Sequence, residues 1–198
     1  MSELNIDVLQ VTTLVVLVLL AIAWYLSYSA ARLDRLHAKV EGAMSVLDAQ
    51  LVRRAEASLE LANTGGLDPA SAFLLADAAT ESLERKTEHA GDDLLEEHNF
   101  AGREDVETDL TLALRVALPH DVVGELRADP DSGAASALSR VESAAVRVQL
   151  ARRFHNQAVA EVRRVRAKRV VRWFRLAGHA GLPAPVDFDD EPPEGLAP

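Results

Sequence analysis

The sequence of 198 residues contains no cysteine, which excludes disulfide bridges, thiolate metal sites and cysteine nucleophiles. Aromatic residues make up only 5% of the chain, and no segment alternates apolar and polar residues as a strand does. The apolar share of 48% is too high for a chain that is disordered throughout. Because Ala and Leu are abundant, the composition favours an all-α protein.

Motifs of enzymatic chemistry are also missing. The sequence has no phosphate-binding glycine loop, no dinucleotide fingerprint, no HExxH and no GxSxG. The six histidines do not have the spacing of a helical metal pair, and His155 falls on an apolar stripe, where we expect a core residue. We therefore expect a protein that is not an enzyme, with no catalytic residue, cofactor or metal site.

One acidic cluster is a candidate cation site. Its carboxylates are spaced i and i+4 and would offer the oxygen ligands that divalent cations prefer. No further ligands lie nearby in the sequence, so a solvated acidic loop is the expectation. The cluster comprises Asp92, Asp93, Glu96 and Glu97.

A long apolar run dominates the N-terminal part of the chain. The 24 residues from Val8 to Ala31 carry no formal charge, and about 20 such residues suffice to cross a bilayer as a helix. A secretory signal peptide is disfavoured, because Glu3 and Asp7 precede the run and no Lys or Arg does. We therefore predict a retained transmembrane helix over residues 8–31, after a short N-terminus of residues 1–7.

The charges on either side of this run predict its direction. Two acids and no base precede it, whereas Arg32, Arg35 and Lys39 follow it. The positive-inside rule then places the N-terminus outside the cell membrane and the remaining chain in the cytoplasm.

Helical periodicity continues through the rest of the chain. Apolar residues recur at helical spacing from Leu33 to Ala62, and Gly65-Gly66 is a stop signal. Asp68-Pro69 begins a second helix, and further helices are predicted at about 103–118 and 134–176. These segments favour an antiparallel up-and-down four-helix bundle over residues 32–178, with long first and last helices. The tail, residues 179–198, is rich in Pro and acids, and we expect it to be mostly disordered.

Charge is unevenly distributed along the chain. Residues 63–131 carry a net charge of −12, whereas residues 152–175 carry +8. An antiparallel bundle returns this basic end to the cytoplasmic leaflet, where each Lys or Arg gains about 1 kcal/mol from anionic lipid. A solvated basic face is the alternative, and nucleic-acid binding is disfavoured by the acidic remainder. The membrane-surface candidates are Arg32, Arg35, Lys39, Arg163, Arg164, Arg166, Lys168, Arg169, Arg172, Trp173, Phe174 and Arg175.

Two segments resemble the LemA family. In the first helix the matching residues are Leu47, Asp48, Gln50, Leu51, Arg53 and Arg54; in the last helix they are Ala151, Arg152, Asn156 and Val159. The ending that closes in Phe188 is also similar to the family. His155 stands where the family usually has Tyr, and Arg163-Arg164 replaces a second Tyr-Asn element. The resemblance implies a membrane-anchored cytoplasmic helical bundle without an established reaction.

Together these features predict a single-pass membrane protein whose cytoplasmic bundle acts in interaction or scaffolding. An anionic-lipid-binding or membrane-remodelling module is the alternative, and a metal-binding or enzymatic bundle is a third. The expected partners are the bilayer and other membrane or cytoplasmic proteins, without nucleic acid. A homo-oligomer remains open.

Overall fold

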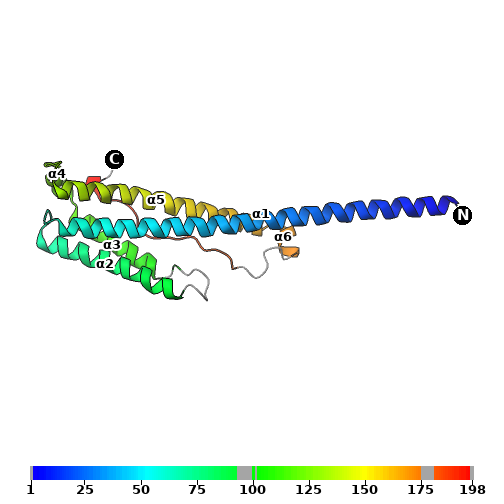
Figure 1. Cartoon of the computed structure of the whole chain (residues 1–198), viewed down its shortest axis with the longest axis horizontal. Helices are drawn as coiled ribbons and strands as arrows, with labels where there is room; N and C mark the ends of the chain where they lie inside the picture. The colour runs from blue at the N-terminus through cyan, green and yellow to red at the C-terminus, as the bar shows by residue number, and fades with distance from the viewer. Residues whose placement is uncertain (1, 93–99, 101, 175–180, 197–198) are drawn as a thin grey trace. The chain divides into compact units, whose positions relative to one another are not determined.

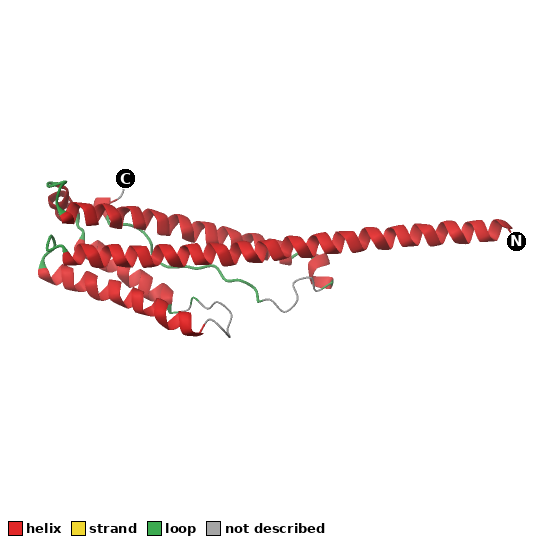
Figure 2. Cartoon of the chain, viewed as in Figure 1, coloured by secondary structure: helices red, strands yellow, loops and turns green. Residues whose placement is uncertain are grey.

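The computed structural model describes residues 2–92, 100, 102–174 and 181–196. Over these residues the chain is all-helical apart from its connections, and no strand occurs among them (Figure 2). The helices labelled in Figure 1 are α1 (Ser2–Asn63), α2 (Pro69–Asp92), α3 (Arg103–Ala117), α4 (His120–Arg127), α5 (Gly133–Arg166) and α6 (Arg169–Trp173). A short 3-10 helix, η1 (Glu194–Leu196), follows near the C-terminus. The prediction of an all-α protein with one long apolar N-terminal helix is confirmed.

The chain divides into two compact units. The smaller unit comprises residues 1–40 and 158–183, and the larger unit comprises residues 41–157 and 184–198.

The predicted boundary between the first two helices is confirmed. α1 ends at Asn63, and Gly65 adopts a φ of 75°, a left-handed conformation that costs glycine little. The Asp68 carboxylate then accepts hydrogen bonds from the amides of Ala70 and Ser71, at 3.0 and 3.1 Å. This N-cap satisfies two amides that the first turn of α2 leaves unpaired. The Ser71 side chain, followed by the amides of Ser71 and Ala70, lowers the pKa of Asp68 by hydrogen bonding to its carboxylate.

The end of the last long helix differs from the prediction. α5 stops at Arg166 instead of continuing to about residue 176. The Lys168 amide donates to the Val165 carbonyl three residues back, at 3.1 Å, which tightens and closes the helix. The short helix α6 follows, and its Val171 is buried with Leu33 and Leu36 of α1. Burial of Val171 explains why the chain turns at a place without Gly or Pro.

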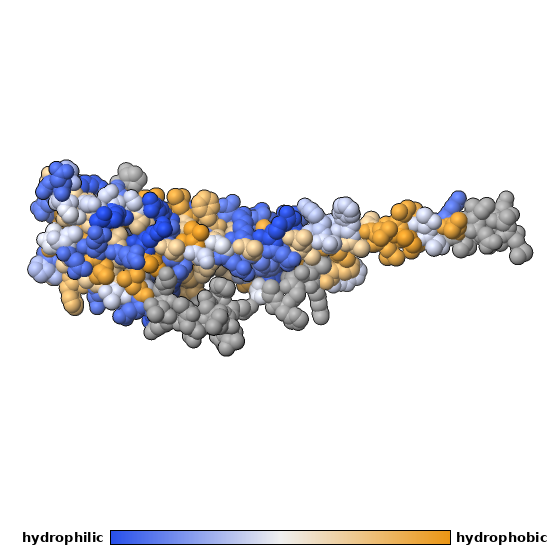
Figure 3. Space-filling model, in the orientation of Figure 1, coloured by the Kyte–Doolittle hydropathy of each residue, from blue (hydrophilic) through white to orange (hydrophobic). Residues whose placement is uncertain are grey.

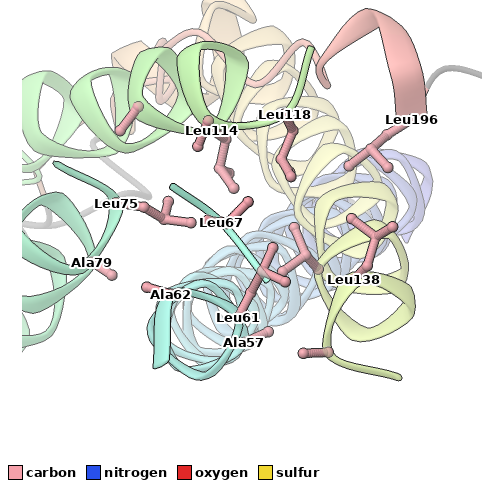
Figure 4. Close-up of a cluster of buried hydrophobic side chains, with 14 of the residues drawn as sticks. Ala57, Leu61, Ala62, Leu67, Leu75, Ala79, Leu114, Leu118, Leu138 and Leu196 are labelled. Carbon is pink, nitrogen blue, oxygen red and sulfur yellow. The ribbon is translucent and has the colours of Figure 1, made fainter. Parts of the chain in front are cut away.

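The core of the larger unit is built from Leu and Ala of several helices. Figure 4 shows Leu61 of α1, Leu75 of α2, Leu114 of α3 and Leu138 of α5 converging in one cluster. Leu196 of η1 joins the same cluster. Small side chains such as Ala57, Ala62 and Ala79 are buried in the same cluster.

In the smaller unit, α1 passes through two different environments. From Leu9 to Ile22 its large apolar side chains are exposed, and this stretch is the apolar band of α1 in Figure 3. Further along, Leu33, Leu36 and Val40 are buried against α5 and α6. An 18-residue window of α1 has a mean hydropathy of 2.3, and by length and composition this helix is able to cross a membrane.

The tail differs from the expectation of disorder. Residues 184–196 belong to the larger unit, where Val186 and Phe188 are buried in a cluster with Leu47 and Leu51. Four acids of the tail are paired with arginines: Asp187 and Asp190 with Arg152, and Asp189 and Glu191 with Arg115. Prolines and acids in the sequence suggested a solvated segment, but buried apolar anchors and ion pairs fix its position.

Candidate functional site

The basic residues that follow the apolar stretch of α1 lie on the exposed face of this helix. Arg32, Arg35 and Lys39 are exposed, whereas Leu33 and Leu36 between them are buried. This alternation follows from the helical period, because residues three or four apart share a face. With a rise of about 1.5 Å per residue, all three cations lie within roughly 17 Å of Tyr28 along the helix axis.

The basic segment at the end of α5 and in α6 is packed against the basic segment of α1. One apolar cluster contains Leu33, Leu36 and Val40 of α1 together with Val162, Val165 and Val171 of α5 and α6. The structure therefore brings the two predicted basic segments together within the smaller unit. The residues of the second segment exposed to solvent are Arg163, Arg164, Lys168, Arg169 and Arg172.

Some of these cations already have partners in the smaller unit. Lys39 forms an ion pair with Glu161 at 3.0 Å. Arg163 donates to the Pro183 carbonyl at 2.9 Å, and the half-buried Arg166 donates to the Gly181 carbonyl. Both arginines thus hold the start of the tail. Arg32, Arg164, Lys168, Arg169 and Arg172 define what we call the basic surface.

Two aromatic side chains lie at the end of this surface. Trp173 is 86% exposed, and its ring centroid lies 5.8 Å from that of Phe174, which is also exposed. An exposed Trp beside arginines is typical of groups that sit among lipid headgroups. Trp24, Tyr25 and Tyr28 of α1 are exposed in the same unit.

The apolar residues that carry the LemA resemblance are buried. Leu47, Leu51 and Ala151 are buried in one cluster. Gln50 is half-buried and Arg53 is exposed. Val159 is buried in the cluster of the smaller unit. The predicted structural role of the apolar positions therefore agrees with their burial.

Arg54 is the most deeply buried cation described. It is 2% exposed, and its guanidinium donates to the Glu107 carboxylate at 2.8 Å and to the Thr111 hydroxyl at 3.0 Å. A buried charge is tolerated only when it is paired and hydrogen-bonded. The pair links α1 to α3 through charges rather than through apolar contacts alone.

Further polar groups complete this network. The second oxygen of Glu107 accepts a hydrogen bond from Ser82 of α2 at 2.8 Å and one from Arg103 at 3.3 Å. Arg103 also forms an ion pair with Asp48 of α1. Two guanidiniums and two carboxylates balance, so the network joins three helices without net charge. Asp48 and Arg54, two residues of the LemA resemblance, therefore have a structural role in this network.

Arginines of α3 and α5 bind the acids of the tail. Arg115 donates to both oxygens of Asp189, at 2.6 and 2.8 Å, and Arg152 donates to both oxygens of Asp190, at 2.7 and 2.8 Å. The hydrogen bonds from Arg115 lower the pKa of Asp189, and the carboxylates raise the pKa of both arginines. These pairs are bidentate, the strongest geometry for a guanidinium and a carboxylate.

Sequence reasoning missed several of these polar residues. Glu107 lies between Val106 and Leu110 on the buried face of α3, and an acid on an apolar stripe four residues after Arg103 was the available signal. Nothing in the sequence around Ser82 and Thr111 distinguishes these two buried residues from polar residues on a helix surface. The partners of Arg115 and Arg152 lie in the tail, far away in the sequence.

Two sequence candidates fall partly outside the described residues. Asp93, Glu96 and Glu97 of the acidic cluster lie there, as does Arg175. His155 is buried in the larger unit, as expected for a core residue. Over the part of the chain that the structure describes, no group of three or more His, Asp or Glu side chains has the arrangement of a metal site.

Comparisons with known proteins give no match: no family model, no curated protein and no solved structure is similar to the chain.

Proposed function

We propose that this chain is a single-pass membrane protein with its N-terminus outside and a LemA-like helical body in the cytoplasm, and that the body acts as a non-enzymatic interaction or scaffold module. In this proposal the helices of the body form the antiparallel up-and-down four-helix bundle that the periodicity predicts. The basic residues after the apolar stretch support the cytoplasmic side by the positive-inside rule.

One observation carries the proposal. Within the smaller unit, the ten large apolar side chains from Leu9 to Ile22 are exposed, whereas Leu33, Leu36 and Val40 of the same helix are buried. Covering one such exposed side chain is worth about 1.5–3 kcal/mol. A bilayer covers all of them at once, which makes the hydrocarbon core the natural environment of this stretch.

The anchor is tested by alkaline carbonate extraction of membranes that contain the full chain. We expect the wild-type chain in the pellet and the double variant Leu17→Arg/Leu20→Arg in the supernatant, because each Arg at the centre of a bilayer costs about 2.5–3.5 kcal/mol. The matched control is Val146→Arg/Leu150→Arg, which places the same charges at two exposed apolar positions of α5. Extraction of the wild-type chain would contradict the anchor.

The interaction role is tested by chemical cross-linking in native membranes. A scaffold gives discrete cross-linked products with the wild-type chain, and these products disappear in Leu47→Asp, because Leu47 is fully buried in the larger unit. Products that persist in the variant would show that the folded body does not make the interaction.

A second function is favoured by a specific observation. The basic surface joins cations from two segments 130 or more residues apart, as in Arg32 and Arg164, and exposed Trp173 lies at its end. Such a surface fits anionic lipid headgroups, to which each basic residue near the membrane adds about 1 kcal/mol. We propose that the smaller unit docks on the cytoplasmic leaflet through this surface.

Tryptophan fluorescence tests this docking, because the chain has only two Trp residues. In a Trp24→Phe chain reconstituted into vesicles, Trp173 is the single reporter. We expect a blue shift when phosphatidylglycerol is added to phosphatidylcholine vesicles, and its loss in Arg169→Glu/Arg172→Glu. An emission that does not depend on the anionic lipid would overturn this second function.

A further inference from the structure

The tail segment 186–190 lies extended along helices α3 and α5 of the larger unit, without helical or strand structure of its own. Side chains of the two helices, rather than backbone groups, bind its main chain. Asn156 binds Val186 twice, accepting from its amide at 2.9 Å and donating to its carbonyl at 2.8 Å. Four further hydrogen bonds hold the main chain. The amides of Asp187 and Asp189 donate to the Glu104 carboxylate at 2.6 Å and to the Thr108 hydroxyl at 3.2 Å. The carbonyls of Asp189 and Asp190 accept from the Thr111 hydroxyl at 2.7 Å and from the side-chain amide of Gln149 at 2.9 Å.

The side chains of the segment are bound as specifically as its main chain. Phe188 is 5% exposed and lies under two guanidiniums, those of Arg54 at 5.8 Å and Arg152 at 5.5 Å from the ring centroid. The two acids that follow Phe188 are each held by a bidentate arginine, Asp189 by Arg115 and Asp190 by Arg152. The sites thus accommodate, in order, one apolar anchor, one buried aromatic ring and two carboxylates.

This arrangement has the features of a peptide-binding site. Main-chain contacts provide affinity for any extended peptide, while an aromatic pocket and arginines select the side chains. Four of the side chains that bind the tail remain half-buried with the tail in place, so they lie at the surface of α3 and α5 and not deep in the core. They are Arg115, Gln149, Arg152 and Asn156.

We propose that this face of α3 and α5, called the peptide groove from here on, recognises an extended segment in which Phe is followed by two acids, and that the tail occupies the groove as a tethered ligand. The partner is a separate protein that carries an extended segment of this chemistry and displaces the tail. Charge complementarity supports this choice, because the arginines that line the groove bind a doubly acidic ligand. The inference rests on the proposed interaction role and names its site and its kind of ligand.

Tethering determines what a binding experiment must show. A tail attached to the same chain competes at an effective concentration in the millimolar range. A free peptide therefore binds weakly to the wild-type chain and well to a chain whose own tail is impaired.

The probe is a fluorescent peptide with the sequence of residues 184–198, added to the full-length chain in detergent. We expect fluorescence polarisation to show binding to Phe188→Ala/Asp189→Ala/Asp190→Ala, and binding to the wild-type chain that is at least about tenfold weaker. Adding Arg152→Glu to the impaired chain abolishes binding, and a peptide with Asp190→Arg restores it. Failure of the peptide to bind the impaired chain while its helical circular dichroism is retained would overturn the peptide groove.

A second measurement does not depend on the folding of the impaired chain. Because the chain has no cysteine, a Glu104→Cys chain with its tail otherwise intact offers one thiol in the groove. A peptide with an activated disulfide at Asp187→Cys should couple to Glu104→Cys at least about tenfold faster than to Asp109→Cys, an exposed position on α3. Equal rates at the two positions, at a peptide concentration above the millimolar effective concentration of the tail, would overturn the proposal.

Other outcomes are distinguishable as well. A disulfide between two copies of a chain carrying both Glu104→Cys and Asp187→Cys would assign the groove to a second copy and overturn a separate partner. Loss of peptide binding with retention in the carbonate pellet would reject the groove and leave the membrane anchor in place.

Discussion

Arg54 of α1 and Glu107 of α3 form an ion pair at 2.8 Å with side chains that are 2% and 0% exposed. Burying two charges costs desolvation free energy, which offsets much of their attraction. Removing one partner is strongly destabilising, because it leaves the other charge buried and unpaired. Because Glu107 also accepts from Ser82 and Arg103, it is the acceptor on which all three helices of the network depend.

Neutralising Glu107 should therefore destabilise the larger unit strongly. Glu107→Gln leaves Arg54 buried without its carboxylate, and breaking a buried pair in this way costs about 3–5 kcal/mol. Urea unfolding of the detergent-solubilised chain, followed by circular dichroism, measures the loss. The control is Glu56→Gln on the exposed face of α1. Equal stability of the two variants would show that the network does not hold the helices together.

Adjacent residues of α1 separate a core position from a surface position. Leu47 is 0% exposed, whereas Val46 is 54% exposed. Leu47→Asp buries a charge and should unfold the larger unit at a cost of several kcal/mol, while Val46→Asp should melt like the wild type. Thermal melts that are the same for both variants would place the core on a different face of α1.

A loop glycine and a helix glycine should respond in opposite directions to alanine. A Cβ at Gly66 would lie 2.8 Å from the Leu126 Cδ2 and 2.9 Å from the Ala134 Cβ, whereas a Cβ at Gly124 meets no atom within 4 Å. Gly66→Ala should lose about 1–3 kcal/mol through overpacking. Gly124→Ala should gain up to about 1 kcal/mol, because Ala favours the helix. The free energies of unfolding of the two variants provide the comparison, and a stable Gly66→Ala would contradict the close packing of this turn.

The ion pair of Asp189 with Arg115 makes the tail sensitive to acid. The pKa of Asp189 in the folded chain lies below its ordinary value of 3.8, because Arg115 hydrogen-bonds the carboxylate. Its contribution is therefore fully present above the unfolded pKa and is lost as the pH falls through the folded pKa. We expect the difference in stability between the wild type and Asp189→Asn to be constant near neutral pH and to start to decline at about pH 3.8, vanishing only below the lower folded pKa. A difference that grows on acidification would have the wrong sign for this pair.

Features of the fold that depend on neighbours in the sequence were predictable. The cap at Asp68, the turn at Gly65 and the buried stripe through Leu47 follow from local residue preferences and helical period. The break after Arg166 carries no Gly or Pro and arises from packing of Val171 against α1. Local patterns contain no information about such a contact.

The polar contacts were less predictable for a similar reason. Asn156 belongs to the resemblance on α5, but its partner Val186 lies 30 residues further on in a segment whose composition suggests disorder. Likewise, Glu107 looks like a surface acid until the helices that bury it are known. Sequence therefore identified the candidate residues of the basic surface, while the groove that holds the tail required the tertiary structure.

The central claim, that α1 crosses the membrane with the body on the cytoplasmic side, is tested most directly by labelling single cysteines in a chain that has none of its own. Ser2→Cys and Asp131→Cys lie before the apolar stretch and in the loop after α4. With a membrane-impermeant maleimide on intact cells, we predict labelling of Ser2→Cys at once and of Asp131→Cys only after permeabilisation. Labelling of Asp131→Cys in intact cells would contradict the account.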